Sequence, residues 1–313
     1  MANILPRDRQ IAVIAALSEG MSIRSVERLT GIHRDTIMRL GASVGRDCAA
    51  LLDVMMRDLP VSLIELDELW SYVGKKQRKV RPDDSSEVGD QYVFIAFDAT
   101  NKAILSYQVG KRNAENTEAF ALDLRSRITG TPQISSDAFP PYLAAIGHAF
   151  GGKRGADYGQ IVKSYQGEPP INAARRYSPG WVVAVEKRVM FGNPRKRLIS
   201  TSYVERSNLN VRMDCRRFTR LTNGYSKKLA NHEAAVALFI ACYNFCRVHS
   251  SIRETPAMAL GLTDHAWSIA ELMDAANGAA ADEPEPDLSP QPIVPSPPVR
   301  GRPQFRVIEG GLR

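Results

Sequence analysis

Three carboxylates, Asp67, Asp137 and Glu205, stand where a protein could use them for metal-dependent chemistry. They are 70 and 68 residues apart, since 137 − 67 = 70 and 205 − 137 = 68. We expect Asp67 inside a strand, Asp137 at the end of another strand and Glu205 on a helix. Carboxylates that converge from such elements hold two divalent cations about 3.5 to 4 Å apart, which activate an attacking oxygen and stabilise the leaving one in phosphodiester displacement. Hard oxygen ligands suit Mg²⁺ or Mn²⁺.

Each of these carboxylates also has a structural interpretation. Glu205 follows Ser202 by three residues, which is the spacing of a capping box at the start of a helix. Asp137 has the position of a turn or helix-capping aspartate. Asp98 and Asp157 are rival second acids, ranked lower because Asp98 occupies a turn between strands and Asp157 lies in irregular, Gly-rich sequence.

The charge of the chain indicates an anionic partner. The 313 residues include 41 Lys and Arg against 34 Asp and Glu, a net charge of +7, and the pI is near 9.3. Twelve Lys and Arg but three acids lie between Arg175 and Arg220. A basic segment beside a carboxylate site is typical of a protein that acts on nucleic acid, which is the leading expected partner; the helix-turn-helix pattern and the family resemblance described below make it double-stranded DNA.

Composition excludes several classes of protein. With 44% hydrophobic and 24% charged residues, the chain has ordinary globular composition. It has no membrane-spanning run or signal peptide pattern, so we expect a cytoplasmic, nucleoid-associated protein. The four cysteines do not form a paired framework. Cys242, Cys246 and His249 could share a helical face, but structural zinc usually requires a fourth ligand.

The amino-terminal segment has the pattern of a helix-turn-helix. We expect helices over 7–18, from Ser22 to Leu29 and from His33 to Leu40, with a tight turn at Thr30-Gly31-Ile32. Short helices around a Gly-containing turn match the motif whose second element enters the major groove. The alternative is a helical bundle with a short connection. The residues expected to contact DNA here are Arg34, Thr36 and Arg39.

The middle of the chain predicts an α/β fold. Strands are expected over 61–73, 92–97 and 103–109 as an antiparallel meander, joined by an exposed loop at 75–90. A helix at 116–127, a short strand at 132–137 and a helix through Ala149 follow. Residues 151–180 read as a loop or loosely packed excursion, and a strand signal resumes at 181–190.

The stretch 201–220 is expected to form a helix with a row of charged side chains on one side and a row of apolar side chains beside it. Glu205, Arg212 and Arg216 stand at i, i+7 and i+11, which places one carboxylate and two guanidiniums on one side. An apolar stripe runs beside them for burial. An apolar, buried helix follows over 231–248, and Thr255-Pro256 begins a short last turn. The basic side chains expected to contact DNA in the stretch are Arg206, Arg212, Arg216, Arg217 and Arg220.

Several of these residues together resemble insertion-sequence transposases of the IS1 type. The blocks that carry the resemblance are Leu66-Asp67-Glu-Leu-Trp-Ser-Tyr-Val73-Gly74, Ser135-Ser-Asp137 with Tyr142, and Tyr203-Val-Glu205-Arg-Ser-Asn208-Leu-Asn-Val-Arg212. Tyr243-Asn244, Arg247, His249 and Thr255-Pro are similar to the segment that closes many transposase cores. The resemblance covers roughly residues 5 to 262, including the helix-turn-helix.

The resemblance implies an RNase H-like mixed sheet flanked by helices and an Asp, Asp, Glu triad of Asp67, Asp137 and Glu205. It implies a DNA transposase that binds terminal inverted repeats, cleaves DNA and transfers the strand with two Mg²⁺ or Mn²⁺ ions. Arg212 would contact phosphate. Synapsis of two ends implies a homodimer or higher oligomer. The alternatives are a non-catalytic, transposase-derived DNA-binding regulator and an RNase H-like nuclease without strand transfer.

The expected domains are 1–58, a helix-turn-helix with a linking helix; 59–265, the catalytic domain; and 266–313, a helix and a flexible tail. The tail is expected to be extended because eight of the 19 prolines lie between Asp282 and Pro303. The loop 75–90, the basic insertion 151–180 and the tail depart from the compact family pattern. The sequence leaves the repeat sequence, target choice, transposition pathway and oligomer open.

Overall fold

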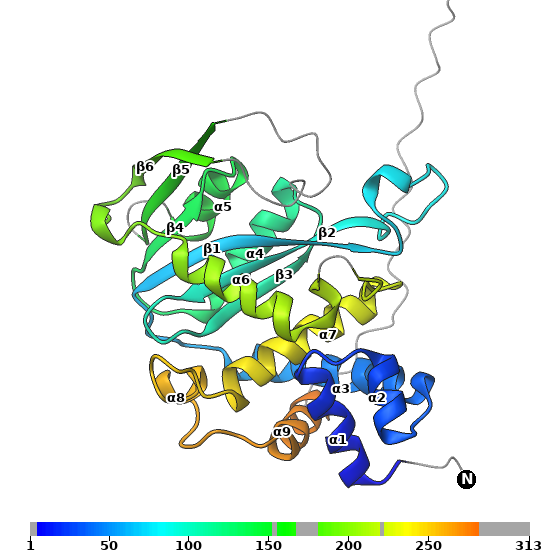
Figure 1. The fold of residues 1–313 in the computed structure, drawn as a ribbon. Coiled ribbons are helices and arrows are strands. Elements are labelled where there is room, and N and C mark those ends of the chain that lie inside the picture. The colour runs from blue at the N-terminus through cyan, green and yellow to red at the C-terminus, as the bar shows by residue number, and fades with distance from the viewer. Residues whose placement is uncertain (1–4, 152–154, 167–180, 220–221, 282–313) are drawn as a thin grey trace, which may run out of the picture. The chain divides into compact units, whose positions relative to one another are not determined.

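The computed structural model describes residues 5–151, 155–166, 181–219 and 222–281. These residues form an α/β fold with a mixed, open sheet of six strands flanked by helices (Figure 1). The strand order is β3-β2-β1-β4-β5-β6. The strands are β1 (Leu63–Val73), β2 (Gly89–Asp98), β3 (Ile104–Gly110), β4 (Gln133–Asp137), β5 (Asp157–Gln166) and β6 (Trp181–Phe191).

Helices precede the sheet, connect its strands and follow it. They are α1 (Arg7–Ser18), α2 (Ile23–Thr30), α3 (Arg34–Met55), α4 (Ala114–Arg127), α5 (Pro141–Ala149), α6 (Ser202–Asp214), α7 (Leu229–Ala241), α8 (Pro256–Ala259) and α9 (Ile269–Ala281). Short 3₁₀ turns are η1 (Gln77–Lys79), η4 (Lys196–Leu198) and η5 (Arg216–Phe218), and a π-turn, η6 (Cys242–Cys246), continues α7. None of the described helices is long and apolar enough to cross a membrane.

The first three strands form the expected antiparallel meander. β1 pairs with β2, and β2 with β3, in antiparallel register. β4 then lies parallel to β1, and β5 parallel to β4, while β6 returns antiparallel to β5. The parallel pairing places the carboxyl end of β4 beside the middle of β1, because strands that run the same way end at the same edge.

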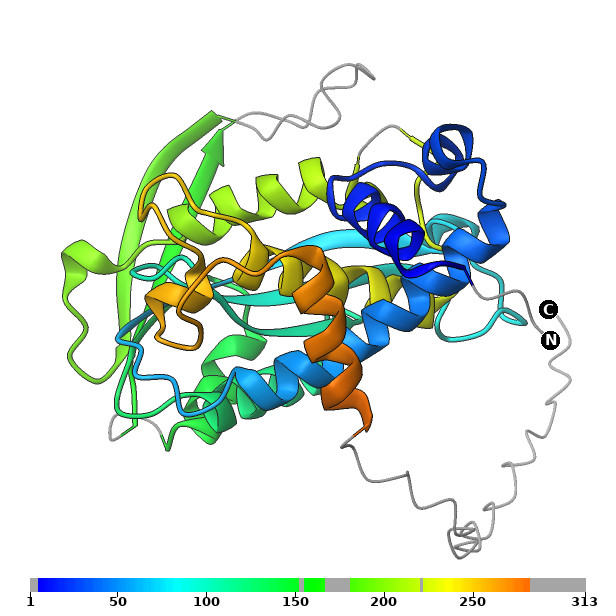
Figure 2. The ribbon, with the colours of Figure 1, turned by 90° about the horizontal axis from the view of Figure 1, so that it is seen from below.

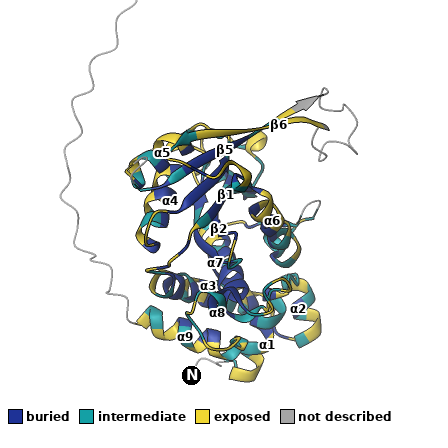
Figure 3. Ribbon diagram, turned by 90° about the vertical axis from the view of Figure 1, so that its left-hand side faces the viewer, coloured by how far each residue is buried: buried dark blue, intermediate teal, exposed yellow. Residues whose placement is uncertain are grey.

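Helices cover both faces of the sheet at β1, so the first residues of both side-chain rows are mostly buried, while Trp70 farther along is exposed. Asp67 and Ile95 are opposite each other, and this face carries α6. Glu68 and Phe94 are opposite each other on the other face, where Phe94 packs on Phe120 of α4. Figure 3 shows α4 and α5 on one side of the sheet and α6 on the other. The alternation of side chains therefore directs successive acids to opposite faces.

A continuous apolar core joins α3 and α7 to the sheet. The two helices approach closely at Gly45, where an added Cβ would lie 2.2 Å from the carbonyl oxygen of Ala234. α9 crosses α3 on its other side (Figure 2). At the end of α7, Asn244 exchanges two hydrogen bonds with the backbone of Ile104, at 3.0 and 2.8 Å. This contact fixes the helical layer to the beginning of β3.

A second, smaller apolar cluster holds α1, α2 and the beginning of α3 together. It contains Val13, Val26, Ile32 and Ile37. The first two helices begin and end close to the expected positions, and the turn at Gly31 has a left-handed φ of 68°. The third helix is one element through Met55, where the sequence predicted a short helix and a separate linking helix. The junction near Gly41 stays helical because the following turns bury Val44, Cys48 and Leu51 in the main core.

Two expectations for the later chain are wrong. The segment after Gly155 is not a loop, because Asp157–Gln166 forms β5 inside the sheet. Gly159 and Gln160 weaken its strand pattern, but an added Cβ at Gly159 would lie 2.5 Å from the Ile199 side chain, so glycine allows Ile199 to pack closely on the strand. Residues 152–154, 167–180 and the proline-rich tail lie outside the described residues.

The long helix expected over 201–220 is also wrong in extent. α6 ends at Asp214, Cys215 is extended, and η5 follows. Arg216 therefore does not continue the stripe of Glu205 and Arg212. The burial of Cys215 and Phe218 turns the chain toward α7, where the Phe218 ring packs on His232 at 5.1 Å. The remaining expected elements, at 181–190, 231–248 and 255–260, are confirmed as β6, α7 with η6, and α8.

Candidate active site

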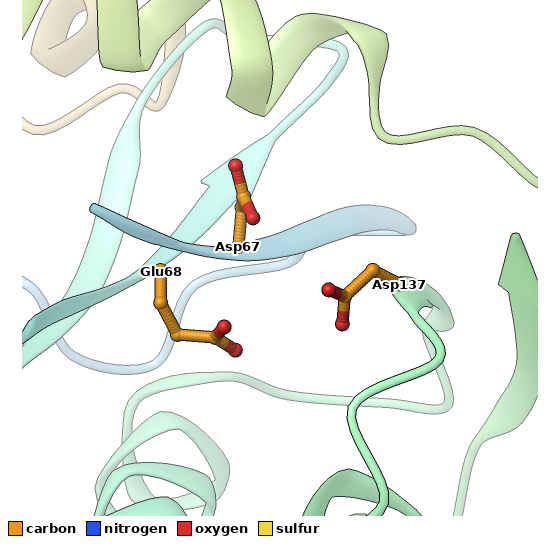
Figure 4. A group of neighbouring side chains, drawn as sticks. All are labelled: Asp67, Glu68 and Asp137. Atoms are coloured by element: carbon orange, nitrogen blue, oxygen red, sulfur yellow. The ribbon is translucent and has the colours of Figure 1, made fainter. Parts of the chain in front are cut away.

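Asp67, Glu68 and Asp137 converge at the edge of the sheet where β4 ends. One carboxylate oxygen from each residue lies within 4.8 Å of the others, and within the described part of the chain this is the group of three acidic, His or Cys side chains able to hold a metal ion. Figure 4 shows Glu68 and Asp137 directed toward each other and Asp67 on the opposite side of the β1 ribbon. The structure thus brings together two of the three acids predicted from sequence and adds Glu68.

Asp67 is held by α6. Its Oδ2 accepts a hydrogen bond of 2.7 Å from Nδ2 of Asn208, which is itself buried. Burial raises the pKa of Asp67 to about 7, and the negative charges of Glu68, Asp137 and Glu205 act in the same direction. A bound cation would favour the ionised form, because opposite charge stabilises a buried carboxylate.

Glu68 points to the opposite face and is more enclosed than Asp137. Its side chain is 3% exposed, and its Oε2 accepts a hydrogen bond of 2.9 Å from Nε of Arg112. The buried Tyr142 hydroxyl lowers the pKa of Glu68 as a hydrogen-bond donor, although the contact lacks standard hydrogen-bond geometry. Burial raises the pKa of Glu68.

Asp137 combines a structural role with a position in the acidic group. Its Oδ1 accepts a hydrogen bond of 2.9 Å from the amide of Phe139, which is the turn interaction expected for an aspartate here. Its Oδ2 lies 3.6 Å from the guanidinium of Arg112. The Arg112 guanidinium also lies 3.8 Å from the centre of the Phe139 ring. One arginine therefore balances two of the three carboxylates.

Glu205 lies near this group but does not join it. Its Oε1 accepts a hydrogen bond of 2.7 Å from the Thr201 hydroxyl and forms an ion pair with Lys163 of β5. Its side chain is 45% exposed, and its charge acts on Asp67. The capping box predicted from Ser202 is not formed, because Thr201 precedes the helix and Ser202 Oγ contacts Ser200.

A carboxylate from β1 caps α6 instead. Oε2 of the buried Glu65 accepts hydrogen bonds from the amides of Tyr203 and Val204, at 2.7 and 3.0 Å. These amides belong to the first turn, where a helix lacks internal partners and favours negative charge. Burial raises the pKa of Glu65, while the two amide hydrogen bonds lower it.

The two rival acids have structural partners away from the acidic group. Asp98 is fully buried and accepts hydrogen bonds from the amide of Thr100 and the side chain of Asn101, at 2.8 and 2.7 Å. Asp157 begins β5 and accepts a hydrogen bond of 2.7 Å from the amide of Asn193. Both aspartates therefore shape turns.

The basic residues expected to contact DNA are distributed over two regions. Arg34 and Arg39 are exposed on α3, and Thr36 between them is half-buried. On the later segment Arg206 is exposed, Arg212 and Arg216 are half-buried, and Arg217 donates a hydrogen bond of 3.4 Å to the carbonyl of Gly224. Burial lowers the pKa of Arg217. Arg220 lies outside the described residues.

The composition of the acidic group fits Mg²⁺ or Mn²⁺. Its donors are carboxylate oxygens, which these hard cations prefer, and it contains no thiolate or imidazole. The cysteines considered for zinc interact with each other and with oxygen atoms: Cys242 Sγ lies 3.0 Å from the Ser18 hydroxyl, and Cys246 Sγ contacts the Ser268 carbonyl. Carboxylates, rather than Cys and His, therefore form the candidate metal centre.

The sequence reasoning missed four residues that shape the site. Glu68 and Arg112 bracket Asp137, Asn208 holds Asp67, and Glu65 caps α6. A signal for the acids was present, since Glu65, Asp67 and Glu68 within one strand violate β propensity together. No local pattern marked Arg112, because its partners come from β1 and β4.

Comparison with known proteins leaves the site to be interpreted from its geometry. No protein-family model matches the sequence, and no curated protein is significantly similar to it.

Proposed function

We propose that the protein is a DNA transposase of the IS1 type with an RNase H-like core. The observation that carries the proposal is the convergence of Asp67 and Asp137, 70 residues apart in sequence, into one acidic group with Glu68. The parallel pairing of β1 with β4 produces this convergence, with Glu205 on a helix over the same strand. The mixed sheet with helices on both faces is compatible with such a core.

The carboxylates of Asp67, Glu68 and Asp137 would hold one or two Mg²⁺ or Mn²⁺ ions. Bound cations would activate the attacking oxygen and stabilise the leaving oxygen of a phosphodiester. Asp67 must be deprotonated to bind, and Asn208 keeps its carboxylate oriented. Glu205 would complete the set after its ion pair with Lys163 opens. Lys163 and Arg112 would then be available as cations beside the scissile phosphate.

Basic residues of α3 and α6 would bind the DNA. The α1–α3 cluster would act as a helix-turn-helix, with Arg34, Thr36 and Arg39 of α3 at the terminal repeat. Arg206 and Arg212 of α6 would hold the flanking backbone. The net charge of +7 favours this association. Two element ends imply at least a dimer on DNA, acting at the nucleoid.

A strand-transfer assay tests the proposal. The full chain is incubated with DNA carrying the element's ends, target DNA and Mg²⁺, and cleaved and joined products are measured. We expect Asp137→Asn to lose at least about 100-fold of both products, since one donor of the metal centre is removed. Asp83→Asn, in the exposed loop after β1, is the matched control and should retain activity. Equal activity of the wild type and Asp137→Asn would refute the assignment.

The position of Glu205 favours one alternative. Because it pairs with Lys163 outside the acidic group, the protein could bind DNA without catalysis, as a transposase-derived regulator, or hydrolyse DNA without joining it. The same assay separates these functions. A regulator would retard end-containing DNA but give no cleavage with Mg²⁺ or Mn²⁺. A nuclease would give cleaved DNA and no joined molecules with either ion.

A further inference from the structure

A pocket of aromatic and basic side chains lies beyond the acidic group along β1. Its volume is about 340 Å³. Its lining includes Trp70 and Tyr72 of β1, Lys76 of the following loop, and Arg217, Asn223 and Tyr225 from the segment after α6. This size is at the small end of ligand pockets, which suits one planar group better than a folded partner.

The aromatic rings form a platform. Tyr72 and Tyr225 are stacked with ring centres 4.8 Å apart, and the Trp70 ring lies 5.8 Å from Tyr72. Trp70 is 36% exposed, although indole rings are usually well buried. The Nζ of Lys76 lies 5.9 Å from the centre of the Tyr72 ring. Exposed rings with cations beside them are the features that bind unpaired bases and their phosphates.

The pocket and the acidic group share one edge of β1. β4 pairs with β1 only over Leu63–Glu65, and the chain returns to this strand near Val73, where the amide of Gly74 donates to the carbonyl of Ser226. Between these contacts, β1 carries Asp67 on one face and Glu68 and Trp70 on the other, because side chains alternate along a strand. Three residues of an extended strand span about 10 Å, so a polymer that passes around this open edge could reach both places.

We propose that this pocket binds a single unstacked base of the DNA strand whose phosphodiester lies at Asp67 and Asp137. The proposal rests on the proposed function. The base would stack on the Trp70 and Tyr72 rings, and Lys76 and Arg217 would contact the phosphates beside it. An unpaired base near the cleavage site would thereby be stabilised, while a fully paired duplex would have to lose one base pair to fill the pocket.

An equilibrium binding measurement, made without catalysis, tests the proposal. Labelled end-containing duplexes, either fully paired or with one unpaired nucleotide at successive positions, are titrated with the full chain without divalent cations, and fluorescence anisotropy is measured. We expect one position near the cleavage site at which the unpaired nucleotide binds about tenfold more tightly, which is the scale of stacking one base on an aromatic ring. Trp70→Ala should abolish this difference, and Trp70→Phe should retain most of it.

Two lysines of the same loop provide a charge control. Lys76 lines the pocket, whereas Lys79 in η1 is exposed and does not. We expect Lys76→Ala to reduce the preference for the unpaired nucleotide and Lys79→Ala to leave it intact. Thermal melting identifies variants that fail to fold, and Trp70→Phe then decides the result. A preference that persists in folded Trp70→Ala, or its absence from the wild type at every position, would overturn the proposal.

This outcome is independent of the strand-transfer result. A wild type that prefers an unpaired nucleotide through Trp70 but neither cuts nor joins DNA would support the pocket and refute the transposase. A wild type that joins DNA but binds paired and unpaired ends equally would support the transposase and refute the base-binding pocket. Tighter binding of the matching RNA strand than of the DNA strand would refute DNA as the occupant.

Discussion

The carboxylate of Glu65 on β1 accepts a hydrogen bond of 2.7 Å from the amide of Tyr203 in the first turn of α6. Two residues farther along each element stand Asp67 of β1, which belongs to the acidic group, and Glu205 of α6, which lies near it. Because β1 caps the helix directly, the position of Glu205 relative to Asp67 is set by a buried contact rather than by a loop. The acid that caps the helix is therefore a positioning residue for the acids proposed to act.

Removing the Glu65 cap should destabilise the protein. We expect Glu65→Ala to lower the free energy of unfolding by about 1 to 3 kcal/mol, because the amides of Tyr203 and Val204 would lose their partner in a buried setting. Glu65→Gln keeps an acceptor oxygen and should cost less. Urea denaturation measures both changes.

Ser202→Ala is the control for the cap. Its hydroxyl contacts only Ser200 among the hydrogen bonds found in the described residues, so we expect a change within about 0.5 kcal/mol. If Ser202→Ala lowered the free energy of unfolding as much as Glu65→Ala, the capping box predicted from the sequence would be supported, and the assignment of Glu65 as the cap would be wrong.

The difference between these two caps shows what the sequence contained and what it lacked. Ser202 and Glu205 have capping-box spacing, but the strand that supplies Glu65 stands 138 residues earlier. Local patterns predicted the meander, the short β4 and the buried α7, since hydrophobic periodicity records which side of an element is covered. They could not predict a partner that tertiary structure brings to a helix end.

The same distinction applies to the acidic group. The order of the blocks around Asp67 and Asp137 was sufficient to predict that these acids meet, and the parallel pairing of β1 with β4 accounts for it. Glu68 points to the other face of β1. Because side chains alternate along a strand, the sequence pattern predicts that Glu68 lies apart from Asp67 and gives no reason to include it in the acidic group. The short β4 ends beside β1, and this open edge lets both side chains reach Asp137. That geometry is a property of the sheet edge and leaves no local pattern.

Cation binding at the acidic group should depend on pH through Asp67. Its pKa is raised to about 7, so below that pH a cation must displace a proton. We expect the affinity for Mn²⁺ to rise by up to about tenfold per pH unit below 7 and to level off above it. Calorimetric titration from pH 5.5 to 8.5 measures this dependence. In Asp67→Asn, binding should be weaker and its slope with pH smaller; an unchanged slope would assign the proton to another group.

Arg112 should compete with a bound cation. It pairs with Glu68 and lies 3.6 Å from Asp137, so it neutralises the two acids from one side. We expect Arg112→Gln to lower the free energy of unfolding without metal, because the buried Glu68 loses its counter-charge. Mn²⁺ should then stabilise the variant more than it stabilises the wild type. Differential scanning fluorimetry with and without Mn²⁺ measures both effects.

Arg125→Gln provides the comparison for Arg112. Arg125 also stands near an aromatic ring, that of Phe150, and it donates a hydrogen bond to the Ile128 carbonyl, away from the acidic group. Its stabilisation by Mn²⁺ should equal that of the wild type. Equal responses of Arg112→Gln and Arg125→Gln would show that Arg112 does not compete with the cation.

His232 should make stability fall in mild acid. Its ring is fully buried, and burial first, then the charge of Arg217, lowers its pKa to about 4. Ser71 donates its hydroxyl proton to the Gln91 carbonyl, so its Oγ accepts from Nε2 of His232, and the ring is neutral with the proton on Nε2. Protonation would leave a charged ring in the core beside Phe218.

The direction of the pH effect follows from which state binds the proton. Between pH 6.5 and about 4, the unfolded chain protonates His232 and the folded chain does not, so this residue lowers the free energy of unfolding by up to about 3 kcal/mol as pH falls. Asp67 acts oppositely, because its raised pKa makes the folded state retain a proton up to about pH 7. The two effects partly cancel in the wild type, and a variant is needed to separate them.

His232→Gln isolates the histidine. It should be less stable than the wild type at pH 8, because the ring contacts are lost, and the difference should shrink by up to about 3 kcal/mol toward pH 4, since glutamine does not titrate. Ser226→Ala removes only the 3.2 Å contact to Nδ1 and should keep the pH dependence of the wild type. Urea denaturation at pH 4, 5, 6 and 8 measures these differences. A constant difference between His232→Gln and the wild type would mean that the buried ring titrates as it does in the unfolded chain.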